Sequence, residues 1–262
     1  MADAPVPLHP IAALRRHTEA RIGLGRFGAG LPTSAHLDFA EAHAKARDAV
    51  HAGFEADAIA ARLAEGGVAS VRVASEAADR ATYLRRPDLG RRLAEASSAA
   101  LAELPGEGVN DLCLVIGDGL SAHAVNTYAA ETALGVLRLL PGEWRVAPVV
   151  LATGARVALS DPVGVALGAR LVLMLIGERP GLSAADSLGA YLTFGPRVGK
   201  TDADRNCVSN IRAGGLVPAL AAPKLAGLLT RARALGFSGV RLKDDEGLIE
   251  AEATPPALPA GR

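Results

Sequence analysis

Six apolar residues in a row, Leu171-Val172-Leu173-Met174-Leu175-Ile176, run into the polar turn Gly177-Glu178-Arg179-Pro180-Gly181. An apolar run of this length that ends in a turn rich in Gly and Pro is typical of a strand buried on both faces. In open parallel sheets, ligands bind in the crevice beyond the carboxyl ends of such strands. We therefore expect one ligand to be faced by the turn that carries Glu178 and by the later polar run around Cys207.

Strand-like and helix-like segments alternate on both sides of this run. Strands or extended segments are expected at residues 111–116, 145–151, 155–159, 190–194 and 240–243, and helices at 121–140, 162–168, 183–188 and 218–235. Repeated alternation of this kind implies crossover connections and a mainly parallel sheet flanked by helices. The sequence therefore predicts an α/β fold.

The chain before residue 105 has a different, mostly helical periodicity. Helices are expected at residues 11–22, 33–51 (with Thr33 or Ser34 as N-cap), 55–65 and up to about 104, with a short strand at 68–73. The segment Pro105-Gly106-Glu107-Gly108 is the best candidate boundary. We expect a helical N-terminal domain with a Pro-rich lead over residues 1–105, an α/β domain over 106–245, and a Pro-rich tail over 246–262.

Composition excludes several classes of partner. The 262 residues are 50% hydrophobic, and 28 basic side chains balance 28 acidic ones. A neutral chain has no electrostatic footprint for nucleic acid or an anionic membrane, and no apolar run is long enough to span a bilayer. Two cysteines, Cys113 and Cys207, do not form a disulfide framework. We expect a soluble cytoplasmic protein that binds neither nucleic acid nor membrane.

Motifs for familiar enzyme chemistry are incomplete. The spacing of Gly23, Gly25 and Gly28 matches a dinucleotide fingerprint, but the segment before it is charged and is not a buried strand. Around Ser121, His123 occupies the place of the second glycine of a nucleophile elbow, and no histidine follows it. The six histidines show no metal-ligand spacing. The sequence predicts no catalytic residue and no metal ligand.

Four features leave alternatives open. Asp118, which follows a predicted buried strand, either holds a ligand or caps the next helix. Glu178 faces a ligand or forms a surface pair with Arg179, and Cys207 is either a small side chain beneath a ligand or a reactive thiol. A local basic patch is either the solvated start of a helix or a contact with a subunit or an anion; it consists of Arg85, Arg86, Arg91 and Arg92.

Five blocks, in order between about residues 14 and 240, resemble the small (beta, or light) subunit of ethanolamine ammonia-lyase. They are Arg21-Ile22-Gly23-Leu24-Gly25-Arg26, Tyr83-Leu84-Arg85-Arg86-Pro87-Asp88-Leu89-Gly90-Arg91-Arg92, Gly117-Asp118-Gly119-Leu120-Ser121, Gly177-Glu178-Arg179-Pro180-Gly181-Leu182 and Ala203-Asp204-Arg205-Asn206-Cys207-Val208-Ser209-Asn210-Ile211. Because the match is spread over separate blocks, it is specific.

The resemblance implies one subunit of an adenosylcobalamin-dependent radical lyase that converts ethanolamine to acetaldehyde and ammonia. In that family, the large subunit is a TIM barrel that holds the substrate, and the small subunit presents a Rossmann-like domain to the cobalamin. The chain would be inactive alone and would work in a hetero-oligomer. Its expected location is the cytoplasm, either free or inside a bacterial microcompartment.

The resemblance also implies three cobalamin contacts, Val157, Glu178 and Cys207. A fixed carboxylate accepts the amide N–H groups of a corrin rim well, and the other two offer apolar surface and backbone groups. Asp118-Gly119-Leu120 lacks the histidine of the base-off cobalamin motif, so no protein histidine here replaces the cofactor's own base. The alternative hypothesis is a non-catalytic regulatory module that binds cobalamin or a nucleotide.

Overall fold

The computed structural model describes residues 10–26, 28–104 and 109–243. Residues 1–9 of the predicted lead, the predicted boundary at 105–108 and the predicted tail over 246–262 lie outside the described residues. In chain order, the elements are η1 (Pro10–His17), α1 (Thr33–His51), α2 (Ala56–Glu65), β1 (Ser70–Ala74), α3 (Arg80–Arg85), η2 (Leu89–Arg91), α4 (Glu95–Ala102), β2 (Asn110–Gly117), α5 (Ala122–Leu139), β3 (Val149–Thr153), η3 (Val157–Leu159), α6 (Ser160–Ala166), β4 (Ala169–Gly177), β5 (Leu188–Phe194), η4 (Asp202–Asp204), β6 (Arg205–Ile211), α7 (Pro218–Leu235) and η5 (Gly239–Arg241), where η marks a 3-10 helix.

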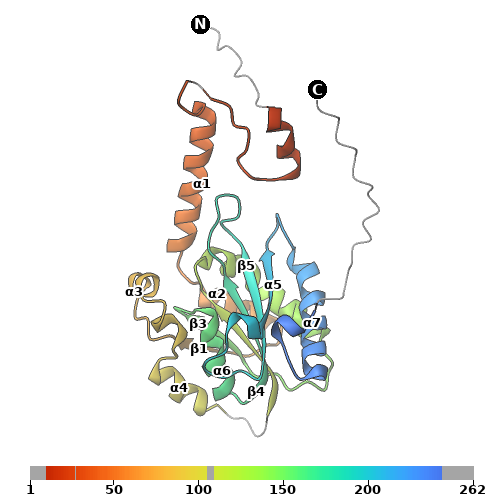
Figure 1. Cartoon of the computed structure of the whole chain (residues 1–262). Coiled ribbons are helices and arrows are strands. Elements are labelled where there is room, and N and C mark those ends of the chain that lie inside the picture. The colour runs from red at the N-terminus through yellow and green to blue at the C-terminus, as the bar shows by residue number, and fades with distance from the viewer. Residues whose placement is uncertain (1–9, 27, 105–108, 244–262) are drawn as a thin grey trace, which may run out of the picture.

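A six-stranded sheet in the order β1-β3-β2-β4-β5-β6 forms the centre of the protein (Figure 1). The first four strands in this order are parallel, β5 is antiparallel to β4, and β6 is antiparallel to β5. It follows that β6 runs in the same direction as the four parallel strands. The predicted α/β class with a mostly parallel sheet is confirmed.

Strand β1 comes from the region before residue 105 and yet belongs to this sheet. It pairs with β3 along its whole length, from Ser70 opposite Val149 to Ala74 opposite Thr153. The predicted strand at 68–73 is therefore present, and the sheet includes chain from both sides of the predicted boundary.

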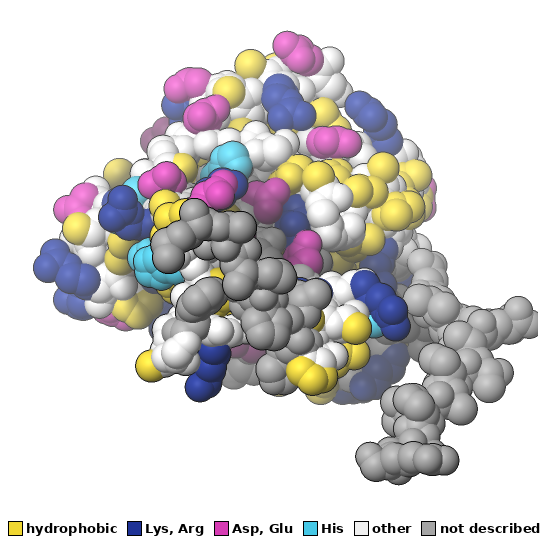
Figure 2. Space-filling view, turned by 90° about the horizontal axis from the view of Figure 1, so that it is seen from above, with side chains coloured by type: hydrophobic (Ala, Val, Ile, Leu, Met, Phe, Trp, Pro, Cys, Tyr) yellow, Lys and Arg dark blue, Asp and Glu magenta, His cyan; other side chains and the backbone are white. Residues whose placement is uncertain are grey.

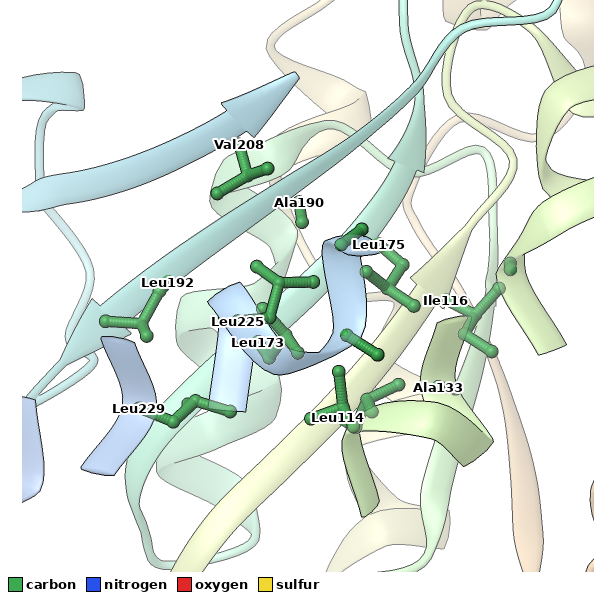
Figure 3. Close-up of a cluster of buried hydrophobic side chains, with 14 of the residues drawn as sticks. Leu114, Ile116, Ala133, Leu173, Leu175, Ala190, Leu192, Val208, Leu225 and Leu229 are labelled. Atoms are coloured by element: carbon green, nitrogen blue, oxygen red, sulfur yellow. The ribbon is translucent and has the colours of Figure 1, made fainter. Parts of the chain in front are cut away.

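Alternate residues of the central strands fill two hydrophobic clusters on opposite faces of the sheet. Leu173 and Leu175 of β4 pack with Leu225 of α7 in a cluster that also includes α2 and α5 (Figure 3). Val172 and Met174 belong to the second cluster, under α4 and α6. Burying one such side chain contributes about 1.5–3 kcal/mol, so a strand that is apolar at every position is stabilised from both sides.

Several predictions for the second half of the chain are wrong. Residues 240–243 are not a strand but overlap η5, where the Asn206 side chain forms hydrogen bonds with the backbone of Gly239 and Leu242. The expected extended segment at 155–159 contains η3, since Asp118 takes the N–H of Ala155. The expected helix at 183–188 is a turn, and the polar strand β6 was not predicted.

Other predicted elements are shifted or shorter. The expected strand at 145–151 begins only at Val149, because Pro148 has no N–H to give to the ladder. The expected helix at 11–22 is limited to η1, which buries no residue and so lacks a packing face. Helix α1 does begin at Thr33, but Pro32 is its N-cap and no side chain caps it.

Helix α1 projects from the body that contains the sheet (Figure 1) and buries only Ala42 and Ala49. Seen from above (Figure 2), acidic and basic side chains are interspersed over this end of the molecule. Within the described ranges, no helix has the length and apolar character needed to cross a membrane.

Candidate functional site

The sheet has a topological switch point between β2 and β4. After β2 the chain turns to β3 on one side, and after β3 it returns to β4 on the other side of β2. The two strands end together, with Gly117 paired to Ile176. Ligands of open α/β sheets bind beyond the carboxyl ends of strands at such a point.

A cavity of about 380 Å³ lies at this switch point. It is lined by Tyr83, Gly119, Leu120, Arg156, Val157, Ile176, Gly177, Glu178, Arg179 and Tyr191. Two of the three predicted site residues, Val157 and Glu178, therefore face the same cavity.

The loop after β2 closes tightly against the end of β4. Leu120 donates its N–H to the carbonyl oxygen of Gly177 over 2.9 Å. Gly119 has a φ of +59°, and a Cβ at this position would collide with the Gly177 carbonyl. Only glycine allows both the left-handed conformation and this close approach, which shapes one wall of the cavity.

The Glu178 carboxylate is held by two donors. Its Oε2 accepts the Ser187 hydroxyl at 2.5 Å and the Asn210 N–H at 3.2 Å. Asn210, with φ +59°, is the one non-glycine residue at positive φ in the described chain, so the backbone adopts an uncommon conformation where it meets Glu178. A Cβ at Gly189 would come within 2.8 Å of the carboxylate Oε1. The carboxylate thus has a fixed position, bound to Ser187 and Asn210 and not to Arg179.

Val157 is placed by the loop after β3, and Asp118 holds that loop. The buried Asp118 carboxylate accepts N–H groups from Gly154 at 3.0 Å and Ala155 at 2.8 Å, besides that of Gly119. Burial raises the pKa of Asp118, while these donors oppose that shift. The capping hypothesis for Asp118 is wrong, because Ser121 caps α5 through the Ala124 N–H. Asp118 connects the loops after β2 and β3.

Cys207 lies beside the cavity and not in its lining. It is exposed on β6, opposite Tyr191 of β5, which does line the cavity. Although the residue as a whole is exposed, desolvation of its thiol raises the pKa of Cys207. A raised thiol pKa disfavours the thiolate, which is the nucleophilic form.

Tyr83, Arg156 and Tyr191 also line the cavity, although the sequence did not single them out as site residues. Tyr83 is fully buried, and its hydroxyl donates to the Ala155 carbonyl over 3.1 Å. Burial raises the pKa of Tyr83 to about 12. The guanidiniums of Arg80 and Arg156 lie 4.8 and 4.2 Å from the centre of its ring. Arg156 could have been found, since it directly precedes Val157, but the approach of Tyr83 depends on the tertiary fold.

The predicted basic patch is interleaved with acidic side chains. Arg86 pairs with Asp88 at 2.7 Å, and Arg92 pairs with both Asp88 and Glu76. Within the part of the chain that the structure describes, no three His, Cys, Asp or Glu side chains form a group that could hold a metal ion.

The family model for the ethanolamine ammonia-lyase light chain (EutC) matches residues 8–243. The chain belongs to this family. Curated relatives are similar in sequence to this chain over nearly the full length of both chains. A protein of Bradyrhizobium diazoefficiens is 53% identical over 94% of this chain and 94% of its own, and one of Rhodopseudomonas palustris is 53% identical over 95% and 96%. One of Azotobacter vinelandii is 51% identical over 94% and 92%. All three are named ethanolamine ammonia-lyase small subunit.

In this member of the light-chain family, the block Ala203–Ile211 ties several parts of the molecule together. Arg205 is buried and forms two hydrogen bonds with Asp161 of α6, at 2.9 and 2.6 Å, and a third with Thr193 of β5 at 2.7 Å. Asn206 fixes η5, as described above, and Asn210 supports Glu178. This block therefore holds β6 and one side of the site.

Proposed function

We propose that the chain is the small subunit of an adenosylcobalamin-dependent ethanolamine ammonia-lyase, which converts ethanolamine to acetaldehyde and ammonia. The observation that carries the proposal is that Val157 and Glu178 line one cavity at the switch point of the sheet. Family membership supports the reaction, and the relatives' designation as small subunits supports a larger partner. The order of the parallel strands, which includes β1 from before the predicted boundary, supports a Rossmann-like arrangement of the sheet.

The residues present fit a corrin rim. Such a rim carries amide side chains, and the Glu178 carboxylate is an acceptor already oriented by Ser187 and Asn210. A charge-assisted hydrogen bond to a fixed carboxylate is stronger than one between neutral groups. Val157 offers apolar surface on the same cavity, and Cys207 is paired across the sheet with Tyr191, which lines the cavity.

The roles of the two subunits follow from this arrangement. When bound, the cofactor would supply the radical chemistry. This chain binds and orients the cobalamin, and we propose that a TIM-barrel large subunit holds the substrate on the other side. A complete site then requires a hetero-oligomer, and the chain alone is inactive. As the resemblance implies, the proposed location of that complex is the cytoplasm, either free or inside a bacterial microcompartment.

Co-production with the large subunit tests the proposal. The assembled pair should release acetaldehyde from ethanolamine only when adenosylcobalamin is added, and the isolated chain should release none. An assembled pair without this activity would contradict the lyase. Tight cobalamin binding by the isolated chain, combined with an inactive pair, would support a non-catalytic cobalamin-binding module instead.

Glu178→Gln tests the cofactor contact. Because the substitution removes the charge and keeps the shape, cobalamin should bind the assembled pair roughly ten- to hundredfold more weakly, as expected for a lost charge-assisted hydrogen bond. Equilibrium dialysis measures the affinity. Glu143→Gln, in the exposed turn before β3, is the matched control and should leave it unchanged. Equal affinity of wild type and Glu178→Gln would exclude Glu178 as a contact.

A further inference from the structure

Arg80 and Arg156 both contact the ring of Tyr83 next to the cavity. Of the two, Arg80 has several hydrogen-bond acceptors within the protein. Arg80 donates to the carbonyl oxygens of Val50, Gly119 and Leu120, at 2.9, 2.7 and 3.2 Å. Its guanidinium also lies 3.7 Å from the Asp118 carboxylate. Arg80 therefore has a structural role, joining the end of α1 to the loop after β2.

Arg156 has far fewer partners. Its guanidinium makes one hydrogen bond within the described residues, to the Tyr83 carbonyl oxygen at 3.1 Å. Its Nε is buried and has no acceptor there. Buried donors are almost always paired, so an orphaned one requires an explanation. Unlike Arg80, Arg156 lines the cavity.

The charges of the cavity lining indicate which kind of group would accept hydrogen bonds from Arg156. Its lining includes two guanidiniums, Arg156 and Arg179, and a single carboxylate, Glu178. Neither arginine forms an ion pair with a described residue, and Glu178 is bound by Ser187 and Asn210. The lining thus has an excess of positive charge and arginine N–H groups without acceptors.

We propose that Arg156 binds the anionic phosphodiester of the ligand that occupies this cavity. This inference rests on the proposed function, because a cobalamin carries a phosphodiester in its nucleotide loop, beside the uncharged amides of its rim. Arginine suits the task because its planar N–H groups match phosphate oxygens in pairs. Stacking on Tyr83 and the bond to the Tyr83 carbonyl fix the plane of the guanidinium before a ligand binds. Glu178 and Arg156 would then bind two different parts of one ligand, the amides of the rim and the phosphodiester.

The test compares two ligands that differ in this group. Cyanocobalamin contains the nucleotide loop with its phosphodiester, and dicyanocobinamide lacks both. Arg156→Gln in the assembled two-subunit protein should weaken binding of cyanocobalamin about ten- to hundredfold and binding of dicyanocobinamide less than about threefold. Arg156→Lys, which keeps the charge but not the paired N–H groups, should give an intermediate loss. Equilibrium dialysis gives the affinities, and thermal unfolding of each variant reports on its folding.

Arg80→Gln is the matched control, because Arg80 contacts the same ring but has its partners within the protein. It should lower the unfolding temperature and affect both ligands by the same factor. An equal loss for both ligands in Arg156→Gln, or no loss for either, would overturn the role of Arg156. Added inorganic phosphate should compete with cyanocobalamin more strongly in wild type than in Arg156→Gln; equal competition would also count against it. If wild type binds neither corrinoid, the proposed function itself fails, which is a separate outcome.

Discussion

The central strands β2 and β4, in the parallel part of the sheet, and the edge strand β6, in the antiparallel part, are held in place by different interactions. In β2 and β4, nearly every side chain is buried, and apolar residues pack on both faces. In β6, burial is interrupted, and the first buried residue is the charged Arg205, paired with Asp161. Strands β2 and β4 of the parallel part therefore depend on apolar burial, whereas in the antiparallel part β5 is also apolar and buried and β6 adds specific polar contacts. One wall of the site comes from each part.

The largest effect is expected from breaking the buried ion pair of the antiparallel part. In Asp161→Ala, the Arg205 guanidinium would remain buried without its counter-charge, because both side chains are only 2% exposed. Loss of one partner of such a pair costs about 3–5 kcal/mol. The free energy of unfolding, measured by urea denaturation, should fall by that amount.

A matched control for this variant is Asp57→Ala, which removes the partner of Arg72 in a pair where Asp57 is 92% exposed. Exposed pairs contribute about 0–1 kcal/mol. If the two variants lost equal stability, the distinction between the two parts of the sheet would not hold for this contact.

The parallel part should respond to the loss of apolar volume. Leu173, with no exposed surface, lies in the middle of β4 and in the cluster with α7. Leu173→Ala should lower the free energy of unfolding by about 2–5 kcal/mol, because it removes buried methyl groups and leaves a cavity. Leu220→Ala, at a side chain that is 64% exposed, serves as the control. A loss below about 1 kcal/mol in Leu173→Ala would mean that the strand repacks.

The smallest effect concerns the turn that leads into β6, and it depends on pH. The Asp204 carboxylate accepts the Thr201 N–H at 2.8 Å and the Thr201 hydroxyl at 2.9 Å, which lowers the pKa of Asp204 from its ordinary value of 3.8. A lowered pKa stabilises the folded state above the unfolded pKa, and the stabilisation is lost as the pH falls through the folded pKa.

Wild type should therefore exceed Asp204→Asn in stability near neutral pH, and the difference should disappear in acid. Urea denaturation of both proteins at a series of pH values measures it. A difference that persisted with the carboxyl protonated would show that the charge of Asp204 is not its cause.

The same contrast explains which elements could be predicted from the sequence. The run at residues 171–176 lies within β4 (Ala169–Gly177), and the helix expected at 218–235 is α7, because burial determines both patterns. Strand β6 has Arg205 at a buried position, so its pattern does not resemble a buried strand. Residues 240–243 resemble a strand, but the contacts of Asn206 hold this segment in another conformation.

Some residues of the candidate site could also be predicted from the sequence, and others could not. Glu178 and the run around Cys207 could be proposed from the residue pattern, because Glu178 follows a recognisable buried strand, and the family resemblance added Val157. Tyr83 could not be placed, because it reaches the cavity from a segment 72 residues before its hydrogen-bond partner Ala155. The roles of Ser187 and Asn210 depend on the pairing of β5 and β6, which residue patterns do not specify.

The position of β4 in the sheet also matters during synthesis. Until β5 leaves the ribosome, β4 has no neighbour on one side, and its six consecutive apolar residues form an open edge of the nascent sheet. Open apolar edges template pairing with other chains. At about 5–20 residues per second, translation of the segment up to Phe194 prolongs this exposure by roughly a second or more. Aggregation during expression should therefore depend on translation speed just after codon 177.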